Sequence, residues 1–212
     1  MNTKKKIVVL GSLLLAVIAA GIAVWHFFPD NRAAHSLYDP SENWLPEDTP
    51  VQMSETKPLP ELAHVIAETY GIPREEWNNT CYYYNYVDLN EDGEEEIFVV
   101  VMGLYTSGSG GDSALLVLPY AGMTVSQTFT LVRTPILVSE DMTGGAHDLV
   151  FLRSGGGGST ELVRLTCVDG IYSMVSNAEV LPFGKVPRGR AILGNDFLAD
   201  RKNGSLLTLA DS

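Results

Sequence analysis

The sequence contains few basic residues and an excess of acidic ones. Three of its 14 lysines and arginines are Lys4, Lys5 and Lys6, so the remaining 11 are outnumbered by all 26 aspartates and glutamates. A region with this charge repels phosphate backbones, which argues against nucleic acid as a partner. There are only two cysteines, Cys81 and Cys167. Their spacing leaves open whether they form a disulfide or stay as buried thiols.

Familiar catalytic and phosphate-binding motifs are also missing. Ser107 and Ser109 lie in the turn "TSGSGG", which is not the G-x-S-x-G pattern of a hydrolase nucleophile. A serine–histidine–acid site would need His147 to approach these serines through the fold, since nothing in the spacing supports it. The segment "SGGGGST" lacks the lysine of a P-loop and precedes a strand pattern. Both segments are better interpreted as hairpin turns of a duplicated unit.

One apolar run is unusually long. Residues 7–28, "IVVLGSLLLAVIAAGIAVWHFF", have His26 as their only strongly polar side chain, and about 20 apolar residues span a bilayer as a helix. The lysines before the run predict a cytoplasmic N-terminus, with residues 29–212 outside the cytoplasm. We therefore expect a single-pass protein of the cell membrane. The alternative is a signal peptide cleaved near Ala19, Ala20 or Ala23, which would release the same domain as a secreted protein.

Composition divides the rest of the chain. After the lysine tail and anchor (1–28), residues 29–60 read as a flexible, acidic, proline-rich linker, and residues 61–212 as the exported domain. The segment "LPELAHVIAETYGIP" predicts a helix that begins at Pro60 and ends before Gly71. Short apolar runs between glycine-rich turns then predict strands. The expected strands are residues 81–87, 97–102, 113–120, 129–133, 135–139, 148–153, 161–168 and 171–176.

An internal repeat organises the strands. "SGSGGDSALLVL" (107–118) aligns without gaps with "SGGGGSTELVRL" (154–165), and residues 88–100 align with 141–152 with one residue fewer in the loop. Two units, about 82–133 and 135–180, are too few for a propeller of the usual ~4–8 blades. We therefore expect a mainly β fold. A short helix would precede an antiparallel β-sandwich or an open, barrel-like domain built from two degenerate repeats.

The loop "DLNEDGEEE" places six acidic residues in nine positions, directly before an apolar strand. It reads D-x-N-x-D-G-x-x-E, which offers an oxygen-only ligand set of the kind that Ca²⁺ prefers. An EF-hand would need a glutamate at the twelfth position and a helix afterwards, but this chain has Val99 and a strand. The alternative is a polar turn without metal. The predicted ligands of a structural Ca²⁺ are Asp88, Asn90, Asp92, the carbonyl of Glu94, and Glu96.

The aligned loop of the second unit departs from this pattern. It retains Asp141, Thr143, Gly144, Gly145 and Asp148, but it lacks the central aspartate. We expect it to form the same turn without a metal.

These residues carry a resemblance to known proteins. The loop before a strand is similar to those of FG-GAP (VCBS-type) repeats. With "YYYNYV", "IFVVVMGLYTSGSGG" and "FTLVRTPILVS" around it, the chain resembles, over about residues 60–210, small exported bacterial proteins of unassigned function described as EF-hand-like. The resemblance implies export and a calcium loop at Asp88, Asn90, Asp92 and Glu96. It implies no reaction and no ligand.

The expected function is that of a non-catalytic binding or interaction module of the cell envelope, with a protein, peptide or glycan as ligand. Residues 82–86 are rich in tyrosine and offer a binding face if they are exposed, or core packing if they are not. The alternatives are a hydrolase that acts on an envelope or extracellular substrate, and a sensor for which Ca²⁺ is the signal. A site where Ser107 or Ser109 meets His147 would favour the hydrolase.

Overall fold

The computed structural model describes residues 43–155 and 158–211. These belong to one compact unit, Pro40–Ser212. The expected membrane anchor, residues 7–28, and the first part of the expected linker lie outside the described residues. Within the described part, no helix is both long enough and apolar enough to cross a membrane.

The first four strands and one strand near the C-terminus form a five-stranded antiparallel sheet. Its order is β12 (Leu207–Thr208), β1 (Cys81–Val87), β2 (Glu96–Met102), β3 (Asp112–Leu118) and β4 (Thr124–Val132). The run "EIFVVVM" of β2 is buried on both faces, which explains why it shows no alternation of apolar and polar residues.

Five later strands form another antiparallel sheet. Its order is β10 (Glu179–Leu181), β7 (Glu161–Leu165), β6 (Ala146–Arg153), β5 (Ile136–Thr143) and β11 (Gly189–Ile192). A small hairpin, β8 (Cys167–Val168) and β9 (Ile171–Tyr172), follows β7. The mainly β, antiparallel character is therefore confirmed, and both sheets are open rather than closed into a barrel.

Helical elements are few and short. Helix α2 (Pro60–Tyr70) begins and ends as expected, with Pro60 in its first turn and Gly71 as a left-handed cap. Helix α3 (Phe197–Asn203) was not expected; Asp196 caps it by accepting the N–H groups of Leu198 and Ala199. The 3-10 turns are η2 (Arg74–Asn79), η3 (Pro119–Ala121), η4 (Val175–Asn177) and η5 (Leu209–Asp211).

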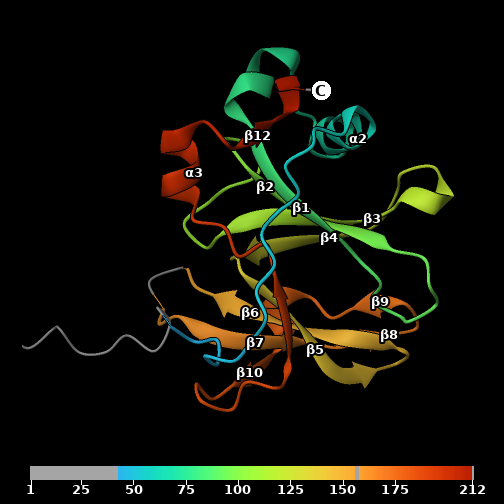
Figure 1. Ribbon diagram of the computed structural model, residues 1–212, viewed down its shortest axis with the longest axis vertical. Coiled ribbons are helices and arrows are strands. Elements are labelled where there is room, and N and C mark those ends of the chain that lie inside the picture. Colours follow the sequence, from blue (N-terminus) through green and yellow to red (C-terminus); the bar gives the residue numbers. More distant parts are fainter. Residues whose placement is uncertain (1–42, 156–157, 212) are drawn as a thin grey trace, which may run out of the picture. The chain divides into compact units, whose positions relative to one another are not determined.

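Within the described residues, three apolar clusters hold together the two sheets and the helix whose ribbons are seen in Figure 1. The largest lies between the two sheets and includes Phe98, Phe129, Leu149 and Phe151. A second joins α2 to the outer face of the first sheet. A third packs Trp44 on the outer face of the second sheet. The order of layers is therefore helix, sheet, sheet and N-terminal segment.

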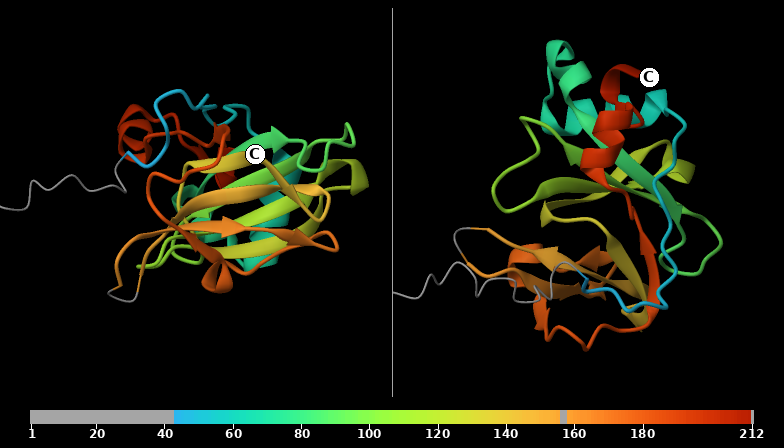
Figure 2. Two further views of the ribbon diagram at one scale, coloured as in Figure 1. Left: turned by 90° about the horizontal axis from the view of Figure 1, so that it is seen from below. Right: turned by 60° about the vertical axis from the view of Figure 1, so that its left-hand side comes forward.

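Residues 43–59, the described part of the expected linker, lie against the domain. Trp44 is only 7% exposed. The N–H of Gln52 donates to the carbonyl of Ala191 (2.8 Å), and the N–H of Ala191 donates to that of Pro50 (2.8 Å). The segment thus extends the edge of β11, and Figure 2 shows it running alongside that strand. This part of the chain acts as a strap across both sheets.

The two cysteines are both free thiols. Cys167 lies in the core between the sheets and is 2% exposed. Cys81 begins β1 and is half-buried. The open question of a disulfide is therefore decided against one.

Candidate metal centre

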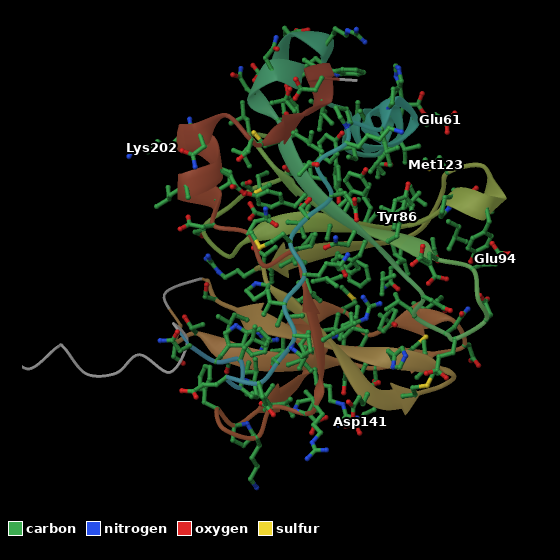
Figure 3. The ribbon with its side chains drawn as sticks, viewed as in Figure 1. Glu61, Tyr86, Glu94, Met123, Asp141 and Lys202 are labelled. Carbon is green, nitrogen blue, oxygen red and sulfur yellow. The ribbon has the colours of Figure 1, made fainter. Side chains whose placement is uncertain are left out.

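The acidic loop connects two neighbouring antiparallel strands. β1 ends at Val87, β2 begins at Glu96, and these two residues face each other in the ladder. The loop projects from one end of the first sheet, where Figure 3 shows Glu94 at its outer side. Because Glu96 belongs to a central strand, the sheet fixes its position, while the predicted ligands before it depend on the conformation of the loop.

Three predicted ligands are turned towards the main chain of the loop. Asp88 Oδ2 accepts the N–H of Gly93 (3.0 Å), Asn90 Oδ1 that of Asp92 (3.0 Å), and Asp92 Oδ1 that of Glu94 (2.8 Å). Asn90 also donates its amide to Asp92 Oδ2 (2.8 Å). Gly93 has a φ of 89°, which a residue with a Cβ atom rarely adopts. The short polar side chains and the glycine therefore shape a tight turn.

Glu96 is the buried member of the set, with only 4% of the residue exposed. Its Oε2 accepts the N–H of Leu89 (3.0 Å) and its Oε1 accepts the hydroxyl of Tyr120 (3.3 Å). Burial raises the pKa of this carboxyl, and the nearby negative charge of Asp92 adds to the effect. Sequence reasoning missed Tyr120, because the 3-10 turn η3 brings it to the loop from beyond β3.

The loop satisfies part of what a bound cation needs. Asp88 Oδ1 is buried and has no hydrogen-bond partner, so a ligand interaction is open to it. However, no group of three or more histidine, cysteine, aspartate or glutamate side chains in the described residues is arranged to hold a metal. Asn90 and the Glu94 carbonyl are outside that set of residue types, although Ca²⁺ readily uses such oxygens. The five predicted ligands share one loop without forming a closed coordination sphere.

The loop is also attached to the second sheet. Leu89 buries its side chain in the core between the sheets, and its carbonyl accepts the N–H of His147 (2.7 Å). His147 Nε2 lies 3.4 Å from a carboxylate oxygen of Glu91. The hydroxyl of Tyr172 in turn donates to the His147 carbonyl (2.8 Å). The loop is therefore in direct contact with the start of β6.

The equivalent carboxylate of the second repeat has a different partner. Asp148, which aligns with Glu96, is fully buried and binds the guanidinium of Arg164 through Nε (2.8 Å) and Nη2. The interaction raises the pKa of Arg164. Arg164 aligns with Val117, so the first repeat has no such cation. Within the described residues, Glu96 has hydrogen bonds but no positively charged partner.

The serines and the histidine lie apart. Ser107 belongs to the turn after the far end of β2, where its hydroxyl donates to Asp112 Oδ1 (2.5 Å). His147 is bound to Leu89 at the other end of β2. Seven residues of strand at about 3.3 Å each separate these ends by roughly 20 Å. Ser107, Ser109 and His147 therefore do not form a nucleophile–base arrangement.

The tyrosine-rich strand is packed rather than open. Tyr82 and Tyr84 lie under α2, and Tyr83 lies between the sheets. All three are at most 3% exposed, so they do not provide a binding face. Comparison with protein families, with curated proteins and with solved structures finds nothing that matches this chain.

Proposed function

We propose that the chain is a single-pass, membrane-anchored protein whose extracytoplasmic β domain is a non-catalytic binding module with a structural Ca²⁺ in the loop 88–96. The apolar run of residues 7–28 supports the anchor. The acidic composition of the rest supports a partner other than nucleic acid. The separation of Ser107 and Ser109 from His147 removes the one hydrolase site that the sequence had offered.

The contrast between Glu96 and Asp148 carries the calcium proposal. Both are buried carboxylates at matching positions of the repeat, and a buried carboxylate is costly unless a positive charge compensates it. Arg164 compensates Asp148, whereas among the residues that the structure describes no cationic side chain pairs with Glu96, and Asp92 lies close by. A divalent cation in the loop would compensate the buried negative charge of Glu96, as Arg164 compensates that of Asp148.

The ion would be held by Asp88, Asn90, Asp92, the Glu94 carbonyl and Glu96, and its contribution is to neutralise the clustered carboxylates. Extracellular calcium modules typically bind with dissociation constants of about 10⁻⁴–10⁻³ M. Such a site is filled outside the cell, so its role is structural. Because Leu89 links the loop to His147, an ordered loop also stabilises the contact between the sheets.

The two sheets have the organisation of a duplicated unit. In the first sheet a loop, β2, a glycine-containing turn and β3 follow one another; in the second the same order is a turn, β6, a glycine-rich segment and β7. This order supports an origin from two repeats, each of which would supply the central strands of one sheet, while β12 and β11 join the two sheets from the C-terminal region. The calcium loop of the first repeat is of the FG-GAP type, and the second repeat has replaced the metal with Arg164.

Thermal unfolding of the full chain in a mild non-ionic detergent tests the calcium site. We compare EDTA, Ca²⁺ and Mg²⁺ for the unchanged protein and for Asp88→Ala/Asp92→Ala. Calcium at ~100 times its dissociation constant should raise the unfolding midpoint by roughly 5–10 °C, and the double variant should lose this rise. Glu94→Ala/Glu95→Ala removes the same charge without a proposed side-chain ligand and should keep it. An absent rise, or an equal rise in the ligand variant, contradicts the proposal.

A further inference from the structure

A cavity of about 740 Å³ lies at the end of β2 opposite the acidic loop. Its walls come from segments far apart in the sequence: the start of β1, the end of β2, the turn before β3, α3 and the C-terminal turn. The volume falls within the range of about 300–1,000 Å³ that small-molecule sites occupy. None of the residues that line it takes part in the proposed calcium loop.

Part of the cavity lining is apolar. Cys81 and Met102 face each other across β1 and β2, so both side chains lie on the same face of the sheet. Phe197 and Leu206 add an aromatic ring and an aliphatic side chain from the C-terminal region. These four side chains form a surface for an apolar group of moderate size.

The two carboxylates that line the cavity already have partners. Asp112 accepts the hydroxyl of Ser107 (2.5 Å). Asp211 accepts both the main-chain N–H (2.6 Å) and the hydroxyl (2.8 Å) of Thr208. Neither carboxylate is free to serve as the main polar contact of a ligand.

Arg201 differs from them. It lines the cavity from the last turn of α3, and within residues 43–155 and 158–211 no hydrogen bond or ion pair to its guanidinium is found. Its charge acts on the Cys81 thiol, where it partly offsets the rise in pKa that burial causes. A guanidinium has five N–H donors in a planar fork that matches a carboxylate. Arg201 is therefore the charged side chain at this cavity that remains available to a ligand.

We propose that this cavity binds a ligand with an apolar body that ends in a carboxylate, with the body against Met102, Phe197 and Leu206 and the carboxylate on Arg201. The C-terminal residue of a peptide and a free monocarboxylic acid share this chemistry. The inference rests on the proposed binding role of the domain and names its ligand class, but it does not depend on calcium.

Alkylation of Cys81 in the full chain provides the test. Iodoacetamide modifies Cys81, which lines the cavity, while Cys167 in the core is an internal reference. N-acetyl-leucine should slow the alkylation of Cys81 in a saturable manner, whereas N-acetyl-leucinamide, which lacks the negative charge, should not. Rates with and without ligand are compared within each variant, because Arg201 itself influences the thiol.

Two neighbouring residues of α3 supply matched variants. Arg201→Gln should weaken the protection by N-acetyl-leucine roughly tenfold or more, since it removes a charge-assisted hydrogen bond. Lys202→Gln makes the same change of charge on the next residue, which Figure 3 labels on α3 and which is not part of the cavity wall, and should retain protection. An unchanged midpoint of thermal unfolding shows that both variants are folded.

Three results would overturn the proposal: no protection by the acid, equal protection by acid and amide, or equal loss in both variants. Isocaproate, which has the same apolar body without a peptide group, distinguishes the two sources. Stronger protection by N-acetyl-leucine indicates a peptide end, and stronger protection by isocaproate indicates a free acid. Since the assay is run in EDTA and repeated in Ca²⁺, failure of the calcium site and failure of this cavity are read separately.

Discussion

The main-chain N–H of His147 donates to the carbonyl of Leu89 across 2.7 Å, and so joins the acidic loop of the first sheet to the start of β6 in the second. The side chain of Leu89 lies in the core between the sheets and is 2% exposed. One residue of the loop thus contributes both a hydrogen bond and an apolar anchor. The loop behaves as part of the sandwich rather than as an independent surface turn.

Leu89→Ala should therefore lower the free energy of unfolding by about 2–5 kcal/mol, the usual cost of removing a buried leucine side chain. Urea unfolding in EDTA measures this without a contribution from calcium. Leu104→Ala is the control, because Leu104 is 80% exposed and its loss should have little effect. A small effect of Leu89→Ala would mean that the loop is not anchored in the core.

Trp44→Ala tests whether the N-terminal strap belongs to the domain. The indole packs on Leu137, Val150 and Leu162 of the second sheet, so its removal should cost about 3–5 kcal/mol. The same urea experiment measures the change, with Leu198→Ala as an exposed control. If Trp44→Ala unfolds like the unchanged protein, residues 43–59 behave as the linker that the sequence suggested.

Gly144 and Gly145 form a matched pair in the β5–β6 turn. Both have positive φ, 61° and 86°, but a Cβ at Gly144 would lie 2.3 Å from the carbonyl oxygen of Cys167, whereas one at Gly145 would meet nothing within 4 Å. Gly145→Ala should cost about 1–2 kcal/mol for the backbone conformation. Gly144→Ala should cost about 1–3 kcal/mol more, because the main chain of the β8 hairpin must move. If both substitutions lowered the free energy of unfolding equally, the result would contradict the close approach of Gly144 to the main chain of Cys167.

Asp200 predicts a pH dependence. Its Oδ2 accepts the hydroxyl of Tyr83 (2.8 Å) and the amide of Asn195 (2.8 Å), and these bonds, that of Asn195 first, lower the pKa of the carboxyl. A lowered folded-state pKa adds stability above the ordinary aspartate value of about 3.9, and this stability is lost as the pH falls through the lower folded value.

Asp200→Asn should accordingly be less stable than the unchanged protein at neutral pH, with the difference shrinking below about pH 4. Urea unfolding at a series of pH values measures both proteins. Asp169→Asn, on the exposed β8–β9 turn, is the comparison. A difference that stays constant down to acidic pH would show that the side-chain bonds do not depend on the charge of Asp200.

Local signals accounted for several elements of the fold. Pro60 and Gly71 marked both ends of α2, because proline suits a first helical turn and glycine the left-handed residue after the last. Strand β2 was recognisable because a short, continuous apolar run is typical of a strand that is buried on both faces. The first half of β4, residues 124–128, was missed because "TVSQT" on an edge strand lacks an apolar run.

Contacts between distant residues were beyond the reach of sequence patterns. Nothing near Trp44 indicates that it packs on the second sheet, and nothing near Asp148 indicates that Arg164 binds it. Tyr120 reaches Glu96 only because η3 returns the chain to the loop. Each of these pairs is set by how the sheets and turns are placed.

The sequence by itself determined the class of the domain, the acidic loop with its candidate calcium ligands, and the long apolar run at the N-terminus. Those features depend on residue type and short spacing, which act within one element. The tertiary structure alone decided that Ser107 and His147 lie at opposite ends of β2 and that Arg201 lines a cavity with Cys81. It also decided that Asp148 has a cationic partner, whereas Glu96 has none within residues 43–155 and 158–211. These relationships arise from the packing of separate strands and turns, and packing depends on the whole chain at once.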